Sequence, residues 1–309
     1  MRVAVMGTGS IGSYFGGMLA LSGQQVALIA RGENLEAIRA NGLRIQTDEE
    51  LLTIPCGDRL WATDDPASLG TVDLTLLTVK TYQNAVAVPA IRPLVGQDST
   101  VLCLQNGIDS YQAAAEVLGA DRVLPGAAYI EAARMGPGMV KQSGSVVRIA
   151  FGEPDGSDSQ RGSTILQVLS DAGINAQFSR DIRQILWTKF LFIATMAGVT
   201  SLSRETMADI MPRPEWRQVI VNCMREIETV ARASQVALAP DIVEATVVYI
   251  EGDLDDMHAS MHADTMAGRP LELEALTGAV VRAGRSAGVP TPINDLIYAA
   301  LKPFAAGVR

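Results

Sequence analysis

Three glycines near the start of the chain have the spacing of a phosphate-binding turn. Gly7, Gly9 and Gly12 form a G-x-G-x-x-G motif between a short apolar run and a helical pattern. The first glycine permits a tight bend, the second lets the backbone approach a pyrophosphate, and the third permits close packing of helix on strand. N–H groups at the helix start attract the phosphates. We therefore predict that a dinucleotide cofactor contacts Gly7, Thr8, Gly9, Ser10, Ile11 and Gly12. A glycine-rich turn without a ligand is the alternative.

The end of the second apolar run carries Arg31. A domain specific for NAD usually has an acidic residue here for the ribose 2′-hydroxyl, whereas arginine suits the 2′-phosphate of NADP. A guanidinium group can form two parallel charged hydrogen bonds with a phosphate. This position predicts NADP (NADPH) as the cofactor. The alternative is a solvated surface arginine paired with Glu33.

Two further polar residues follow apolar runs that predict strands. Lys80 ends one such run, and Asn106 follows the next one along the chain. Ligands of doubly wound sheets bind at the carboxyl ends of the strands, so both residues are candidates for the site. The alternatives are an exposed charge at a helix start for Lys80 and a plain Asn-Gly turn for Asn106.

The elements that must position these residues alternate in the first half of the chain. Strand patterns at 2–6, 25–30, 72–79 and 100–104 are separated by helical patterns, which predicts a Rossmann-type parallel sheet. Three strand patterns at 122–129, 138–142 and 146–151 predict an antiparallel extension. Helical patterns dominate afterwards, at 181–197, 214–234, 240–255, 258–266, 270–287 and 294–304. The predicted fold is therefore α/β, with a Rossmann domain at 1–180 and an all-helical domain at 181–309.

Composition excludes several classes of function. The chain has 34 acidic and 25 basic residues, a net charge of −9, and such a surface repels nucleic acid. Cys56, Cys103 and Cys223 form no C-x-x-C motif and suit a reducing cytoplasm. The first strand begins at Arg2, which leaves no room for a signal peptide. The longest apolar stretch, 185–199, is interrupted by Lys189, so we expect no membrane span.

Together these motifs resemble the ketopantoate reductase family over essentially the whole length. The resemblance rests on the glycine motif, Arg31, Thr78-Val79-Lys80, Gln105-Asn106-Gly107, Trp187-Thr188-Lys189, and the pair Ser260 and Glu272. It implies reduction of a 2-oxo acid with NADPH. It also implies that Lys189 donates a proton to the ketone oxygen, Glu272 contacts the nascent hydroxyl and Ser260 binds the substrate. Lys80 and Asn106 would lie around the ribose and nicotinamide, with Asn106 next to the substrate.

The role implied for Lys189 makes chemical sense. A hydride that arrives at a carbonyl carbon moves negative charge onto the oxygen, which a nearby ammonium group can stabilise and protonate. Lys189 lies within an apolar run, 185–192, where an ammonium group should have a purpose. The alternative is a solvated helix residue. Glu272 follows Pro270, so it could instead complement a helix dipole in a first turn, and Ser260 could be a surface serine.

The chain departs from the family pattern after the lysine. Typical members have asparagine four and eight residues later, where this chain has Ile193 and Ala197. We expect both to line the substrate site, because residues four apart share a helix face. The substrate is therefore ketopantoate or a more apolar 2-oxo acid, and a non-catalytic NADP-binding regulator is a further alternative. Beyond this small molecule we expect neither nucleic acid nor membrane as a partner, and a homodimer stays an open option.

Two histidines, His258 and His262, stand four apart. That spacing could hold a metal ion on a helix, but no third ligand accompanies them. We predict no metal site.

Overall fold

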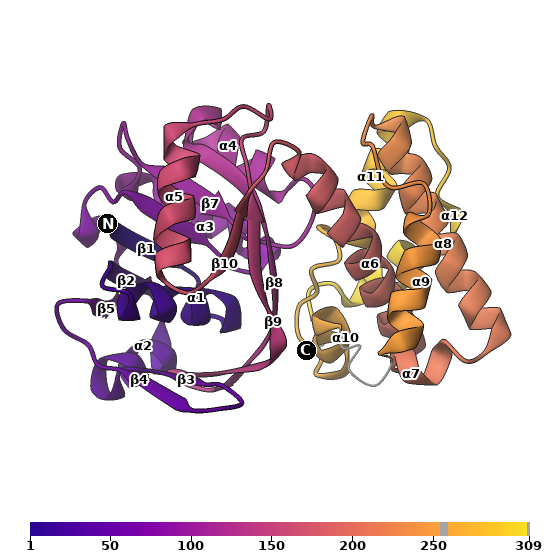
Figure 1. Cartoon of the computed structure of the whole chain (residues 1–309). Coiled ribbons are helices and arrows are strands. Elements are labelled where there is room, and N and C mark those ends of the chain that lie inside the picture. The colour runs from indigo at the N-terminus through magenta and orange to yellow at the C-terminus, as the bar shows by residue number, and fades with distance from the viewer. Residues whose placement is uncertain (254–258, 308–309) are drawn as a thin grey trace. The chain divides into compact units, whose positions relative to one another are not determined.

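The computed structural model describes residues 1–253 and 259–307, and the chain divides into two compact units (Figure 1). The first unit contains Met1–Gln105 and Ser110–Ile182, and the second contains Asn106–Asp109 and Arg183–Arg309. The sequence predicted two domains with a boundary at 180/181, and that boundary stays a prediction. It did not include the short segment Asn106–Asp109, which joins the second unit.

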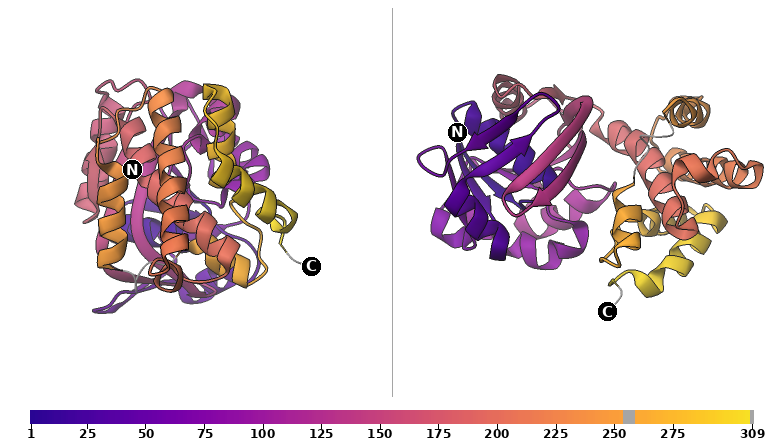
Figure 2. Two further views of the ribbon diagram at one scale, coloured as in Figure 1. Left: turned by 90° about the vertical axis from the view of Figure 1, so that its right-hand side faces the viewer. Right: turned by 90° about the horizontal axis from the view of Figure 1, so that it is seen from below.

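A single sheet organises the first unit (Figure 2). Within the described residues its strand order is β4-β3-β9-β8-β7-β6-β1-β2-β5, with β10 beside β9. Strands β5, β2, β1, β6, β7 and β8 pair in parallel, whereas β8 and β9 are antiparallel. The predicted parallel sheet with an antiparallel extension is confirmed. The strands are β1 (Arg2–Met6), β2 (Gln25–Ile29), β3 (Leu43–Gln46), β4 (Leu51–Ile54), β5 (Leu60–Thr63), β6 (Leu74–Leu77), β7 (Thr100–Cys103), β8 (Val123–Gly136), β9 (Met139–Phe151) and β10 (Asn175–Phe178).

The antiparallel extension differs from its prediction in one respect. The patterns at 138–142 and 146–151 belong to one strand, β9, which pairs with the long strand β8. The register shifts between Ile130 and Glu131, opposite Gly144, whose φ is +71°. Glycine adopts this backbone conformation without strain, so the chain forms a bulge where the sequence pattern predicted a turn.

Helices cover both faces of the sheet. Successive residues of a strand point to opposite faces, so each face presents apolar side chains that pack against helices. In β1, Val3 and Val5 belong to a cluster with Phe15 of α1, whereas Ala4 and Met6 belong to a cluster with residues of α3 and α4. This alternation follows from the two-residue period of a strand. The helices of the first unit are α1 (Ser10–Leu21), α2 (Gly32–Asn41), α3 (Asn84–Ala90), α4 (Ser110–Leu118) and α5 (Gln160–Asp171).

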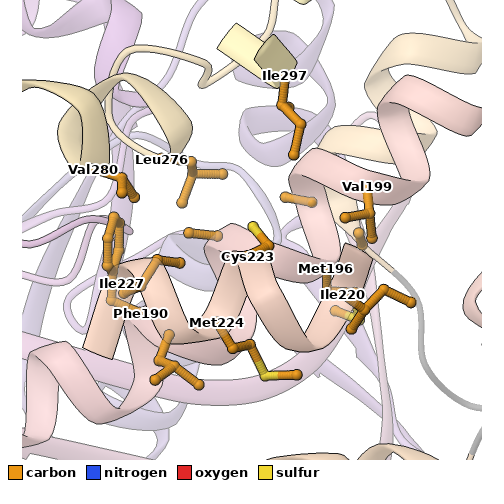
Figure 3. Packing of buried hydrophobic residues seen from close by; sticks show 14 of the residues in the cluster. Phe190, Met196, Val199, Ile220, Cys223, Met224, Ile227, Leu276, Val280 and Ile297 are labelled. Atoms are coloured by element: carbon orange, nitrogen blue, oxygen red, sulfur yellow. The ribbon is translucent and has the colours of Figure 1, made fainter. Parts of the chain in front are cut away.

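The second unit is helical, as predicted, and has its own apolar core (Figure 3). Phe190 of α6, Cys223 and Ile227 of α8, Val280 of α11 and Ile297 of α12 are each at most 1% exposed. The helices are α6 (Ile182–Ser203), α7 (Met207–Ile210), α8 (Pro214–Ala233), α9 (Ile242–Gly252), α10 (Ser260–Met266), α11 (Thr277–Ala287) and α12 (Pro292–Leu301).

Helix α6 is the core helix of this unit. In the described part of the chain it is the one helix long and apolar enough to cross a membrane by length and composition, and 67% of its most apolar window is buried. Phe190, Leu191 and Ala194 belong to the core cluster. Burial inside the protein therefore accounts for the apolar character of α6.

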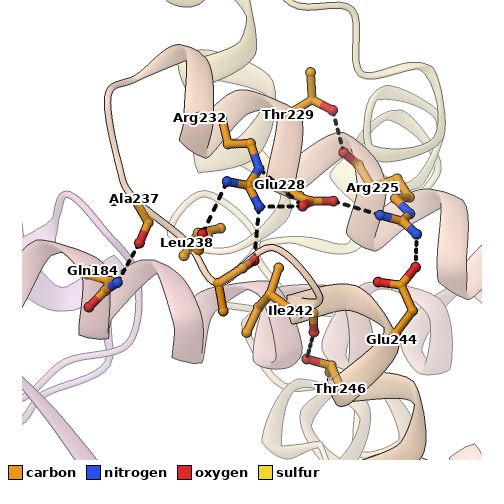
Figure 4. A network of polar contacts seen from close by, with 11 residues as sticks. Gln184, Arg225, Glu228, Thr229, Arg232, Ala237, Leu238, Ile242, Glu244 and Thr246 are labelled. Atoms are coloured by element: carbon orange, nitrogen blue, oxygen red, sulfur yellow. Dashed lines mark hydrogen bonds and ion pairs between the residues drawn. The ribbon is translucent and has the colours of Figure 1, made fainter.

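Charged side chains hold α8 to its neighbours (Figure 4). The carboxylate of Glu228 accepts hydrogen bonds from Arg225 at 3.1 Å and from Arg232 at 2.8 Å. Arg225 also pairs with Glu244 of α9, and Arg232 donates to the carbonyl oxygen of Leu238 at 3.1 Å. Charge-assisted bonds of this kind fix α9 and the preceding loop against α8.

Candidate active site

The glycine turn has the geometry that its motif predicts. Gly7 has φ +109°, and a Cβ there would lie 2.6 Å from the amide nitrogen of Val79. A Cβ on Gly12 would lie 2.1 Å from the carbonyl oxygen of Gly7. A Cβ on Gly9 would meet no atom within 4 Å. Backbone therefore fills the space beside the first and third glycines, whereas the second is open to a group from outside, which fits a pyrophosphate.

The start of α1 completes this cradle. The helix begins at Ser10, and its N-cap Gly9 offers no side chain to the first turn. The first N–H groups of a helix have no acceptor within the helix. The backbone of Ser10 and Ile11 is thus suited to bind an anion.

Asn34 supports the turn, a role that the sequence did not reveal. Its Nδ2 donates to Thr8 Oγ1 at 2.8 Å and to the Thr8 carbonyl oxygen at 3.3 Å. Its Oδ1 accepts from the backbone N–H of Gly138, at the β8–β9 turn, at 2.8 Å. Asn34 thereby connects the glycine turn to a part of the sheet 104 residues away in sequence.

Arg31 follows β2 and is the N-cap residue of α2. It is exposed, and among the described residues its side chain has no hydrogen-bond or ion-pair partner. The alternative pairing with Glu33 is therefore not formed. An exposed guanidinium group at this strand end fits a phosphate on the ribose.

Lys80 lies just after β6, at the start of a short 3-10 helix (Thr81–Gln83), and is half-buried. Gln105 fixes the backbone before it: its Nε2 donates to the carbonyl oxygen of Val79 at 2.7 Å and to Asn84 Oδ1 at 2.6 Å. Asn84 Nδ2 returns a bond to Gln105 Oε1 at 3.2 Å. The sequence analysis named Gln105 only as part of a motif. In the structure Gln105 is buried and holds the backbone next to Lys80 in place.

In the helical unit, Lys189 contacts Asn106. Nζ of Lys189, on α6, donates to Oδ1 of Asn106 at 3.1 Å. Asn106 is consecutive to Gln105 yet belongs to the second unit with Lys189. The structure therefore brings together two predicted site residues that are 83 positions apart.

Glu272 is the second charged group at this point, and its carboxylate interacts electrostatically with Lys189. Burial lowers the pKa of Lys189 to about 8, and the negative charge of Glu272 opposes that shift. Glu272 is only 4% exposed. It does not stand in the first turn of a helix, as the sequence suggested: a turn at 273–276 follows it, and α11 begins at Thr277. A helix dipole is therefore not the reason for a carboxylate here.

The other predicted substrate contacts differ in how exposed they are. Ser260 is the first residue of α10, is exposed, and makes no side-chain hydrogen bond within the described residues. Ile193 is half-buried against the helical core, and Ala197, 4% exposed, belongs to that core.

The predicted lack of a metal site concerned His258 and His262. His258 lies outside the described residues. His262 is half-buried on α10, and no metal-binding group of three or more His, Cys, Asp or Glu side chains occurs among the residues that the structure describes.

Comparison with known proteins gives the family. Residues 3–156 match ketopantoate reductase PanE/ApbA, and residues 181–305 match its C-terminal domain. The chain belongs to the ketopantoate reductase family. It is an oxidoreductase that acts on a keto or hydroxyl group, so the alternative of a non-catalytic regulator loses its support.

Members of the family are similar to this chain over nearly its full length. It is 28% identical to the 2-dehydropantoate 2-reductase of Mesorhizobium japonicum, over 99% of this chain and 98% of that protein. The crystal structure of 2-dehydropantoate 2-reductase from Geobacter metallireducens has a TM-score of 0.91 at 28% identity, over 98% and 99% of the two chains. D-mandelate dehydrogenase with NADH and anilino(oxo)acetate has a TM-score of 0.89 at 26% identity, over 99% and 98%.

Proposed function

We propose that this member of the family is an NADPH-dependent reductase of a 2-oxo acid. The observation that carries the proposal is the group of Lys189, Asn106 and Glu272, in which Glu272 is buried and the other two residues are half-buried. A general acid works best when its pKa lies near the working pH, and the pKa of Lys189 is about 8. The turn of residues 7–12, Arg31 and Lys80 would hold the cofactor.

The cofactor supplies a hydride to the carbonyl carbon when it is bound. Lys189 stabilises the negative charge that develops on the carbonyl oxygen and gives it a proton from Nζ. Asn106 fixes the direction of the ammonium group through the 3.1 Å hydrogen bond. Glu272 keeps Lys189 protonated in its buried setting, because an opposite charge favours the ammonium form. Ser260 binds the substrate.

The preference for NADPH rests on Arg31. D-mandelate dehydrogenase is a relative solved with NADH, so the family alone does not select the cofactor. The Arg31→Gln variant should lose one to two decades of NADPH preference, because a hydrogen bond to a charged group contributes about 1.5–3 kcal/mol. Arg39→Gln is the control, since Arg39 lies on α2, the helix that follows Arg31, but its side chain binds the carbonyl oxygen of Ala62. An unchanged kcat/KM ratio for NADPH over NADH in Arg31→Gln would contradict the assignment.

The substrate itself should have a hydrocarbon tail. Ile193 lies one turn after Lys189 on α6, where typical family members offer an amide. Three hydroxyls of α6 could replace that amide: Thr195, Thr200 and Ser201. The hydroxyl of Thr200 donates to the carbonyl oxygen of Met196 at 2.7 Å, and Thr195 and Ser201 are each only 1% exposed. A substrate hydroxyl beside Ile193 would then lose its water partners at a cost of about 1–3 kcal/mol. The similar D-mandelate dehydrogenase was solved with an oxo acid that carries an aromatic ring, anilino(oxo)acetate.

A substrate panel tests this function directly. We expect turnover of NADPH with 2-oxoisovalerate and with a phenyl-substituted 2-oxo acid, and a lower kcat/KM with ketopantoate. The Ile193→Asn variant should gain towards ketopantoate. No turnover with any 2-oxo acid would refute the reductase proposal, whereas a strong wild-type preference for ketopantoate would refute only the hydrocarbon tail.

A cytoplasmic location and the open option of a homodimer stay predictions. The three cysteines are free, and Cys103 and Cys223 are buried, which suits a reducing compartment.

A further inference from the structure

Two short segments of the helical unit carry the partners of Lys189. Asn106 begins the segment Asn106–Asp109, and Glu272 precedes the turn at 273–276. Neither segment is a helix or a strand, so neither has a regular backbone ladder to hold it. Leu273 and Leu276 hold the turn to the core, and Ala275 and Leu276 donate to the Glu272 carbonyl oxygen at 3.2 and 3.1 Å. What has to be fixed in addition is the position of one segment relative to the other.

The backbones of the two segments already lie in contact. Gly107 has φ +111°, and a Cβ there would lie 2.9 Å from the carbonyl oxygen of Ala275. Ile108 packs against the core of the unit. Both segments thus reach the core of the unit, but their direct contact with each other consists of one glycine against one carbonyl group.

Arg282 of α11 binds both segments at once. Its Nη2 donates to Asp109 Oδ2 at 2.9 Å and to the carbonyl oxygen of Glu274 at 3.0 Å. Its Nη1 donates to Glu274 Oε2 at 3.2 Å. Asp109 lies three residues after Asn106, and Glu274 lies two residues after Glu272. A single guanidinium group therefore bridges the segments that carry the two partners of Lys189.

Glu274 is also bound by residues of α12 and of the short 3-10 helix that follows it. Oε1 of Glu274 accepts from the hydroxyl of Tyr298 at 2.9 Å and also pairs with Lys302. Glu274 is thus held from two directions, and Arg282 transmits that fixed position to Asp109. Guanidinium suits this task because its planar fork directs several donors at once.

We propose that Arg282 is a positioning residue, which sets Asn106 and Glu272 at working distance from Lys189. This inference rests on the proposed function. Arg282 and Asp109 are half-exposed, so their ion pair adds little to global stability. Its effect should fall on geometry, where a displacement of about 1 Å can cost catalysis strongly.

The kinetic test compares Arg282→Gln with Arg285→Gln. Arg285 lies on the same helix and forms an exposed ion pair with Asp295 at 3.4 Å, away from both segments. We expect Arg282→Gln to lower kcat about tenfold or more, with the KM for NADPH and the unfolding temperature close to those of Arg285→Gln. Asp109→Asn should lower kcat similarly, and the double variant should lose no more than the worse single variant. Equal kcat values for Arg282→Gln and Arg285→Gln would overturn the proposal.

A second readout does not depend on turnover. The chain has four lysines, Lys80, Lys141, Lys189 and Lys302, so ¹³C-methylation of lysines should give resolved NMR signals for each. We expect the titration midpoint of Lys189 to fall by about half a unit in Arg282→Gln, because Glu272 and Asn106 move away from the ammonium group. An unchanged or higher midpoint overturns the proposal. If the wild type reduces no 2-oxo acid but this midpoint falls, the reductase function fails and the positioning role stands.

Discussion

In the proposed function, the chemistry of this chain depends on Lys189. It is the one lysine of α6, and the residues around it on that helix belong to an apolar core. Burial disfavours its charged form, and Glu272 only partly compensates. The protein therefore holds a cation where it is a ready proton donor near neutral pH.

This setting predicts how activity changes with pH. In the proposed mechanism the ammonium form is the proton donor, and this form is lost as the pH rises through about 8. We expect kcat/KM for 2-oxo acid reduction to be constant between pH 6 and 7 and to fall about tenfold per unit well above 8. Profiles of wild type and Glu272→Gln would measure this, with the midpoint shifted down in the variant because the compensating charge is gone. A profile that stays flat to pH 10 would exclude Lys189 as the donor.

Asn34 holds the glycine turn through side-chain hydrogen bonds. Asn34→Ala removes the bonds to Thr8 and Gly138, which leaves the glycine turn free to move. Each lost hydrogen bond should cost about 0.5–1.5 kcal/mol, so NADPH should bind roughly tenfold more weakly with kcat at saturation nearly unchanged. Asn41→Ala, at the exposed end of the same helix, is the control. Equal NADPH dissociation constants for the two variants would show that Asn34 does not support the turn.

Among the elements, α12 depends on a cap from another helix. Glu226 of α8 accepts from the backbone N–H groups of Ile293 and Asn294 at 2.8 and 3.0 Å, and from Asn294 Nδ2 at 2.7 Å. Glu226→Ala should lower the free energy of unfolding by about 1–3 kcal/mol, because buried donors lose their acceptor. Gln218→Ala on the exposed face of α8 should change it by less than about 0.5 kcal/mol. Urea unfolding of the two variants measures the difference, and equal values would mean that water replaces the cap.

The sequence predicted the elements whose signals are local. The parallel strands, the glycine turn and the helical second half follow from apolar periodicity and motif spacing. The helix predicted at 270–287 begins seven residues later, because Pro270 indicated a start while the chain instead forms a turn at 273–276. The short strands β3, β4 and β5 were missed, since four residues give too little periodicity to detect.

The site residues that the sequence predicted also have local signals, whereas the ones that it missed do not. Asn106 was named from its position after a predicted strand and Lys189 from the family resemblance, and the structure brings them into contact. Asn34, Arg282 and Glu226 act through side-chain bonds to residues far away in sequence, which no local pattern reports. Only a folded chain reveals such partners.

At the scale of the whole molecule, the chain passes between the units after Gln105, after Asp109 and after Ile182. Gln105 is buried in the first unit, and its neighbour Asn106 is bonded to Lys189 in the second. Unfolding of the second unit would therefore release a segment whose flanking residues, Gln105 and Ser110, are buried in the first unit. We expect the two units to unfold in one cooperative transition.

Cofactor binding tests that cooperativity, because the predicted phosphate contacts all lie in the first unit. At one hundred times its dissociation constant, NADP⁺ should stabilise the protein by about 2.7 kcal/mol. The three tryptophans give a separate signal for each unit: Trp61 lies in the first, and Trp187 and Trp216 lie in the second. In variants that keep only Trp61, or only Trp187 and Trp216, the urea midpoint should rise equally with NADP⁺. The Arg31→Gln variant is the control, in which both signals should move less at the same NADP⁺ concentration. A midpoint that rises for Trp61 alone would mean that the units unfold independently, despite the three passages of the chain between them.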